Sequence, residues 1–174
     1  MPELTPQERL QPALLDRLSD DDPANQQPEP RDKRIINATR LRQAVLRDLS
    51  WLFNTTRLES EDESLADYPY AQKSVINFGL PALAGETASQ LDVVQLETSI
   101  RQAILDFEPR IVPATLRVEA IVAELALNHH NVVSVQITGQ LWAQPVPLEI
   151  LLRTELDLES GKVEVQDLGR GRSA

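Results

Sequence analysis

The first strongly periodic segment of the chain carries apolar residues at spacings of three and four. These spacings place the apolar residues on one face of an amphipathic helix, which we expect to run from about residue 36 to residue 53 and to stop at Asn54. The residues of this face are Ala38, Leu41, Val45, Leu49 and Leu52. The segment is also rich in arginine, and a solvated face is the simplest interpretation of Arg34, Arg40, Arg42 and Arg47.

A second helical pattern begins near residue 89 and ends before Pro109, because proline disfavours helical backbone at the residue that precedes it. Its cap is expected from Thr87 or from Ser89, and Glu97 and Arg101 are expected to form an ion pair on its outer face. Its apolar face consists of Val93, Leu96, Ile100, Ile104 and Phe107.

A shorter segment between these helices, residues 74–81 (SVINFGLP), predicts a short helix. Gly79 is expected to close this helix, because glycine readily adopts the backbone conformation that follows a last helical turn. Pro81 then prevents the helix from continuing.

After Pro113 the pattern changes to an alternation of apolar and polar residues, which is typical of strands with one buried face. Alternating runs occupy residues 116–122, 133–141 and 148–156, and a last short strand is expected around Val163 and Val165. Turns at residues 128–131 and 159–162 join these runs. Helices followed by strands predict an α+β domain, with N-terminal helices packed on one face of a three- to four-stranded antiparallel sheet.

The first 31 residues differ from the rest in composition. They contain six of the 12 prolines, and residues 20–30 are acidic and proline-rich, which is typical of an extended linker. A short apolar stripe before the linker is either a fraying terminal helix or a docking peptide; it comprises Leu10, Leu14, Leu15 and Leu18. We therefore divide the chain into a docking peptide and flexible acidic linker (1–31), an α+β domain (32–168) and a flexible tail (169–174).

The chain has 174 residues, a formal net charge of −10, 41% hydrophobic residues and no cysteine. This hydrophobic fraction suffices for a core, and the lack of cysteine excludes disulfides, thiol nucleophiles and cysteine-based metal sites. An acidic chain is a poor general binder of nucleic acid and of anionic membrane surfaces. No apolar run approaches the roughly 20 residues of a membrane span, and no signal peptide is visible, so we expect a soluble intracellular protein.

Two local clusters resemble metal sites only superficially. Residues 61–63 (EDE) lack the spacing of a calcium loop, and we interpret them as a solvated loop. His129 and His130 are adjacent in a predicted turn, where neighbouring side chains point apart, so a surface turn is the better interpretation. The common phosphate-binding, dinucleotide-binding, serine hydrolase and zinc protease motifs are absent.

The one polar constellation that merits weighing lies where the second helix ends, at residues 106–110 (DFEPR). Three interpretations compete. Glu108 is a general acid with Asp106 or another carboxylate as its partner, as in glycoside hydrolases. Alternatively, Glu108 and Arg110 form a local ion pair that locks the turn, or Pro109 presents both charges to a protein partner. The residue types alone favour the structural ion pair.

Four segments, in order along the chain, resemble the type VI secretion baseplate subunit family TssE. They are residues 10–18 (LQPALLDRL), residues 46–55 (LRDLSWLFNT), residues 68–69 with 74–81 (YP and SVINFGLP), and residues 107–110 (FEPR). Phe53 and Phe78 depart mildly from the leucine and tyrosine of the family. The strand region agrees with the family by pattern rather than by motif.

This resemblance implies a cytoplasmic structural subunit without a cofactor, homologous to a baseplate protein of contractile phage tails. Such a subunit joins TssF and TssG in the baseplate wedge, possibly with TssK, and starts polymerisation of the TssB–TssC sheath at the cytoplasmic face of the inner membrane, without nucleic acid or membrane insertion. The resemblance makes Glu108, Pro109 and Arg110 a protein-interaction element, in which we expect Arg110 to be part of a mostly exposed ion pair. A lysozyme-like glycan hydrolase that uses Glu108 is the alternative function.

Overall fold

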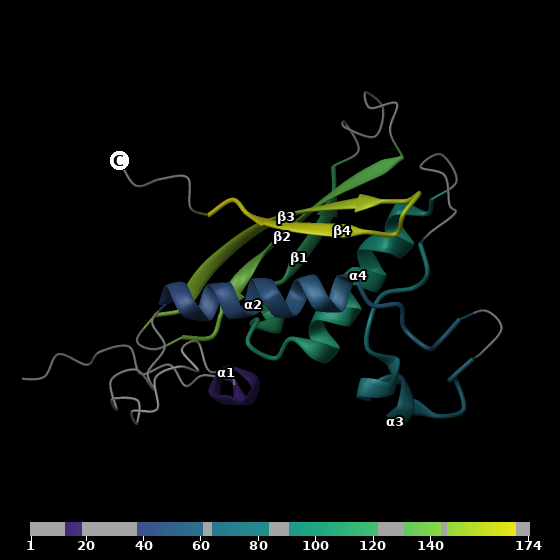
Figure 1. Cartoon of the computed structure of the whole chain (residues 1–174), viewed down its shortest axis with the longest axis horizontal. Helices are drawn as coiled ribbons and strands as arrows, with labels where there is room; N and C mark the ends of the chain where they lie inside the picture. Colours follow the sequence, from purple (N-terminus) through teal and green to yellow (C-terminus); the bar gives the residue numbers. More distant parts are fainter. Residues whose placement is uncertain are drawn as a thin grey trace, which may run out of the picture.

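The computed structural model describes residues 13–18, 38–60, 64–83, 91–121, 131–143 and 146–169. The elements are α1 (Leu14–Leu18), α2 (Ala38–Phe53), α3 (Pro69–Gln72), the 3₁₀ helix η2 (Val75–Asn77), α4 (Val93–Phe107), the 3₁₀ helix η3 (Pro113–Thr115), β1 (Arg117–Ala120), β2 (Val132–Leu141), β3 (Leu148–Asp157) and β4 (Val163–Asp167). The helices precede the strands, which confirms the α+β class (Figure 1). The acidic linker, residues 61–63 and the histidine pair lie outside the described residues.

The four strands form one antiparallel meander in the order β1-β2-β3-β4. One row across the sheet pairs Val118 with Ile137, Ile137 with Leu152, and Leu152 with Asp167. Alternate residues of each strand point to the core, because successive side chains of a strand lie on opposite faces. The period-two pattern of the sequence therefore corresponds to a real inner face, and its buried members include Val133, Val135, Ile137, Leu141, Ile150, Leu152 and Leu156.

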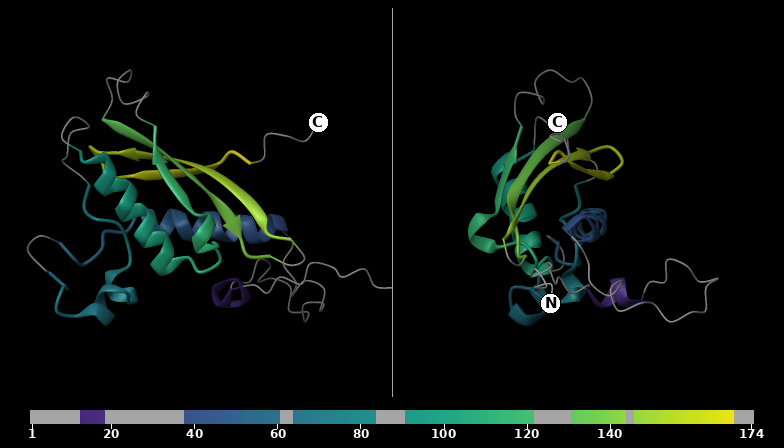
Figure 2. Two further views of the ribbon diagram at one scale, coloured as in Figure 1. Left: turned by 180° about the vertical axis from the view of Figure 1, so that it is seen from behind. Right: turned by 90° about the vertical axis from the view of Figure 1, so that its left-hand side faces the viewer.

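Two long helices cover this inner face, with α2 beside β4 and α4 beside β1 (Figures 1 and 2). The face that the sequence predicts for α2 is the buried one, with Leu49 fully inside the core. On α4 the buried side chains are Leu96, Ile100, Ala103 and Ile104. Among the described residues, none of these helices combines the length and the apolar character that a membrane crossing requires.

The start of α4 differs from the expectation. The helix begins at Val93, and its cap is Asp92, whose carboxylate accepts a hydrogen bond from the Gln95 N–H at 3.0 Å. Glu97 also departs from the predicted outer ion pair. Its carboxylate instead accepts a hydrogen bond at 2.7 Å from the N–H of Ala120, because α4 packs against β1 and brings Glu97 to that edge.

Gly79 has a different role from the predicted helix closure. It follows η2 with a φ of +130°, and a Cβ atom at this position would overlap the backbone of Thr55. Leu80 then pairs with Thr56 in a parallel bridge, in which the Leu80 N–H donates to the Thr55 carbonyl at 2.8 Å. The glycine therefore permits the close approach of two chain segments.

The outer edge of β4 is capped at one residue by a side chain. The N–H of Val163 donates to Asn54 Oδ1 at 3.0 Å, and Asn54 Nδ2 donates to the Val163 carbonyl at 2.8 Å. The amide of Asn54 thus pairs with the edge as a neighbouring strand would. Asn54 lies immediately after α2, so the same residue ends the helix and fixes the start of β4.

Candidate functional site

The turn at residues 108–110 begins where α4 ends. Glu108 is the last residue to donate into the helix, to the Ile104 carbonyl at 2.8 Å, and its own backbone is non-helical (φ −121°, ψ 76°). The following Pro109 disfavours helical backbone at Glu108, which accounts for the end of the helix here. The N–H of Ile111 donates to the Glu108 carbonyl at 3.2 Å, which closes the turn.

The same turn is joined to the sheet. The N–H of Trp142 donates to the Arg110 carbonyl at 2.7 Å, and the N–H of Val112 donates to the Gln140 carbonyl at 2.8 Å. Ile111 therefore pairs with Leu141 at the end of β2. The turn lies at the junction of the helical and strand layers.

Glu108 and Arg110 form a two-pronged ion pair within this turn. Arg110 Nε donates to Glu108 Oε1 at 2.6 Å, and Arg110 Nη2 donates to Glu108 Oε2 at 2.5 Å. The Glu108 side chain is 3% exposed and that of Arg110 is 21% exposed. The expectation of a mostly exposed ion pair is therefore wrong, because packing at the end of α4 encloses most of both side chains.

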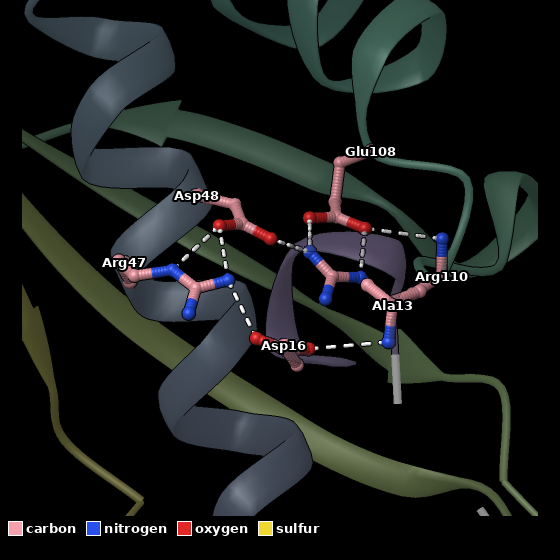
Figure 3. Close-up of polar contacts among 6 residues, drawn as sticks. All are labelled: Ala13, Asp16, Arg47, Asp48, Glu108 and Arg110. Carbon is pink, nitrogen blue, oxygen red and sulfur yellow. Dashed lines mark hydrogen bonds and ion pairs between the residues drawn. The ribbon is translucent and has the colours of Figure 1, made fainter. Parts of the chain in front are cut away.

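Three further charges extend this pair into a cluster (Figure 3). Arg110 Nη2 also donates to Asp48 Oδ2 on α2, and Asp48 Oδ1 accepts from Arg47 Nε at 2.9 Å. Arg47 Nη2 in turn lies 2.8 Å from Asp16 Oδ1 on α1. Acidic and basic groups alternate along this ion cluster, which we define as Asp16, Arg47, Asp48, Arg110 and Glu108.

The cluster fixes the charge state of its two arginines. Burial by itself lowers the pKa of Arg110, but the hydrogen bonds and charge of Glu108, followed by those of Asp48, outweigh burial and raise that pKa above its ordinary value. The same competition, with Asp48 and Asp16 as the acceptors, raises the pKa of Arg47. Both guanidinium groups therefore stay charged across the pH range in which proteins fold.

A groove of about 490 Å³ opens beside the ion cluster. Its walls are mainly apolar and come from α2, from the segment around Phe78 and from the turn at Pro109. Phe78 and Phe107 meet edge to face with ring centroids 5.2 Å apart. Trp51 contributes its ring to the wall and lies 5.2 Å from the Arg47 guanidinium carbon, a cation–π distance. The groove therefore combines an apolar wall with a charged rim.

Helix α1 lies at the entrance of this groove. Ala13 and Leu15 contribute to the lining, and Asp16 Oδ2 accepts a hydrogen bond from the Ala13 N–H at 3.2 Å. The apolar stripe of the sequence predicts a role for the leucines, yet Leu14 and Leu18 are 72% and 73% exposed. Asp16, whose side chain is 14% exposed, forms an ion pair with Arg47 of α2.

Sequence reasoning alone identifies only part of this cluster. It singles out Glu108 and Arg110, but it treats Arg47 as solvated and assigns no role to Asp48 or Asp16. The sequence does contain a signal for Arg47 and Asp48, because both belong to the family-like motif at residues 46–55. What the linear pattern lacks is the contact between Asp48 and Arg110, which are 62 residues apart.

The arrangement offers little of what catalysis needs. Asp106, the proposed second carboxylate, accepts a hydrogen bond from Gln102 at 2.9 Å along α4 and does not join Glu108. Among the residues that the structure describes, no three histidine, aspartate or glutamate side chains gather in a way that could hold a metal ion. The described residues therefore form an α+β module in which an internally paired ion cluster lies beside an apolar groove.

Comparison with known families defines this module further. The model of the family baseplate wedge protein gp25 matches residues 39–146, more than half of the chain, and the protein therefore belongs to that family of contractile, phage tail-like machines. No curated protein and no solved structure matches the chain. The matched region contains α2, α4 and four of the five members of the ion cluster, whereas α1 and the β3–β4 hairpin lie outside it.

Proposed function

We propose that this chain is the wedge subunit of a type VI secretion baseplate. In this role it joins TssF and TssG, with TssK as a further candidate partner, and it connects the wedge to the TssB–TssC sheath and starts sheath polymerisation. It acts in the cytoplasm, at the cytoplasmic face of the inner membrane when assembled. Membership of the baseplate wedge family supports the general role. The motifs at residues 46–55, 74–81 and 107–110 support the type VI assignment.

The observation that carries this proposal is the rigid turn at residues 108–110. Glu108 holds Arg110 from within, the backbone of Arg110 is bonded to β2, and Asp48 holds the guanidinium from α2. Pro109 is exposed at the tip of the turn. We infer that Pro109 and the outer edge of Arg110 contact a wedge partner, and that Glu108 positions them for that contact.

A glycan hydrolase, the alternative, is disfavoured by the same geometry. A general acid must reach the glycosidic oxygen of its substrate, with a second carboxylate across the cleft. Glu108 is almost completely buried, and both of its carboxylate oxygens accept hydrogen bonds from Arg110. Asp48, a second carboxylate beside the same groove, is bound to the same arginine. Arg110 thus lies between the two carboxylates, where an acid–base pair would need to hold its substrate.

The outer edge of β4 supports a connection to another chain by strand addition. Val163 directs its N–H and C=O toward Asn54, away from β3. Because these directions alternate along an antiparallel strand, the groups of Val165 and Asp167 point the same way. Within the described part of the chain, no backbone hydrogen bond reaches these outward groups. Such an edge is able to accept a strand from a partner.

Affinity capture of the tagged full-length protein from the cells that produce it tests the proposed function. We expect mass spectrometry to identify TssF and TssG, and we expect Pro109→Ala to reduce their recovery without lowering the melting temperature. Pro109 is exposed, so this variant keeps the ion cluster intact. Peptidoglycan turnover that Glu108→Gln abolishes would instead support the hydrolase.

A further inference from the structure

The chain between α2 and α4 contains a loop that is closed at its base, and we define the lobe as its residues 56–60 and 64–80. The two ends of the lobe meet, because the Arg57 N–H donates to the Leu80 carbonyl at 2.9 Å and the Leu80 N–H donates to the Thr55 carbonyl at 2.8 Å. The lobe carries α3 and η2, and α3 lies apart from the sheet in each view (Figures 1 and 2). Ordered loops of this kind often carry binding residues on a rigid scaffold.

Asn77 orders the lobe from its interior. This residue is buried, its Oδ1 accepts from the Glu59 N–H at 2.9 Å, and its Nδ2 donates to the Gln72 carbonyl at 3.0 Å. Gln72 Nε2 in turn donates to Glu59 Oε1 at 2.8 Å. The edge-to-face contact between Phe78 and Phe107 then joins the lobe to the end of α4. The lobe therefore has a defined conformation before any partner is present.

The lobe exposes four large apolar side chains, which we define as the lobe tip: Tyr68, Tyr70, Val75 and Ile76. Tyr70 is 93% exposed and Val75 is 82% exposed. Among the described residues, no other stretch of nine residues exposes as many large apolar side chains. The lobe tip contributes nothing to the core, and exposed apolar groups gathered in this way mark a site of association.

The charges next to the lobe tip indicate which kind of partner fits it. Residues 59–67 contain five acidic residues and no basic residue, and this run leads directly into Tyr68. An anionic membrane or a second copy of this chain, with its net charge of −10, would be repelled. A protein surface with lysine and arginine around an apolar recess would instead attract the acidic run and bury the tyrosine rings.

We propose that the lobe tip is a docking surface for another protein, one that presents an apolar recess rimmed by lysine and arginine. The lobe tip shares no residue with the turn at Pro109 or with the outer edge of β4, so it is an additional contact. The docking follows from the exposure and the charge of the lobe, and it does not depend on which machine contains the chain.

The test introduces the photo-crosslinking amino acid p-benzoylphenylalanine at position 70 of the full-length chain, in the cells that produce it. Irradiation should join position 70 to another protein. Mass spectrometry should locate the attachment in a segment that combines apolar residues with lysine or arginine. The same amino acid at position 94 is the matched control, because Val94 is 69% exposed on α4, outside the lobe, and it should give much less product.

Variants of the crosslinking chain separate the apolar contribution from the charge. Val75→Ser combined with Ile76→Ser should lower the crosslinking yield at least about 10-fold. The melting temperature should not change, because both side chains are exposed. Asp67→Lys should lower the yield several-fold at low salt. Glu164→Lys makes the same change in net charge at an exposed site of β4 and should leave the yield unchanged.

Several results would overturn the proposal. They are a product that contains two copies of this chain or a lipid in place of another protein, a yield at position 70 no higher than at position 94, and a yield that the double serine variant leaves intact. Equal effects of Asp67→Lys and Glu164→Lys would overturn the basic rim of the partner.

These outcomes are distinguishable from those of the proposed function. Failure of the crosslink leaves the wedge assignment in place, because the capture of TssF and TssG is tested with Pro109→Ala, outside the lobe tip. Capture of neither TssF nor TssG overturns the wedge assignment, and a specific crosslink from position 70 then still identifies the lobe as a docking surface.

Discussion

Arg110 illustrates how far single residues can be interpreted before their contacts are known. Its position two residues after Glu108 makes a local ion pair foreseeable, and the structure contains that pair. The approach of Asp48 from α2 is not foreseeable, because it depends on how α2 and α4 pack. The contact with Asp48 adds a structural role to Arg110, which ties α2 to the turn that follows α4.

Arg110→Ala should therefore lower the free energy of unfolding by about 2–4 kcal/mol, because it leaves the nearly buried Glu108 carboxylate unpaired. The measurement is the urea denaturation midpoint. Lys162→Ala is the matched control, since it breaks the exposed pair between Lys162 and Glu164, and it should cost less than about 1 kcal/mol. Equal effects of the two substitutions would mean that the Glu108–Arg110 pair behaves as a surface ion pair.

Buried apolar residues should dominate stability over any single charge. Leu49 and Ile100 are fully enclosed on α2 and α4, and truncating either to alanine should cost about 2–5 kcal/mol, because a cavity remains. Val94→Ala, at an exposed site of α4, should change stability by no more than about 0.5 kcal/mol. The assignment of the inner faces would be wrong if chemical denaturation could not distinguish these three variants.

At the scale of elements, periodicity predicts the long segments well and their ends less well. The apolar faces of α2 and α4 and the alternation of β2 and β3 occur where the pattern places them. The predicted start of α4 and the predicted role of Gly79 were wrong. Asp92 caps α4 through a local hydrogen bond, but Thr87 and Ser89 were equally plausible caps from the sequence. Gly79 is required by its close approach to the Thr55 backbone, and a contact between two segments is not visible in a local sequence pattern.

The Asn54 cap of β4 should be visible in amide hydrogen exchange. Asn54→Ala removes both side-chain bonds to Val163, so the Val163 amide should exchange markedly faster. The Gln166 amide belongs to the ladder with Arg153 on β3 and should serve as an internal control with nearly unchanged exchange. Unchanged protection at Val163 would show that Asn54 does not cap this edge.

The turn between β3 and β4 should respond to acid. The hydroxyl of Ser160, followed by the N–H groups of Glu159 and Ser160, lowers the pKa of Asp157 below its usual value. A lowered folded-state pKa gives stability that is present above the ordinary aspartate pKa and is lost as pH falls through the lowered value. Carboxyl NMR titration should show this direction, and Ser160→Ala should move the pKa of Asp157 back up. A pKa that Ser160→Ala leaves unchanged would contradict the assignment.

For the whole molecule, the layers were predictable and the site was predictable only in part. Helices before strands, with apolar periods of 3.6 and then two, lead directly to helices on one face of a meander. The turn at residues 108–110 was identified from its charges and its proline. The groove and the ion cluster were not, because they require α1, α2 and the end of α4 to converge from three distant parts of the chain.

In the function that we propose, this chain links a type VI baseplate to its sheath. Counting fluorescent foci of a labelled sheath subunit in living cells tests it most directly. Deletion of the gene for this chain should abolish the foci. Complementation with the wild-type chain, or with the Lys162→Ala control, should restore them. Normal numbers of foci in the deletion strain would contradict the account.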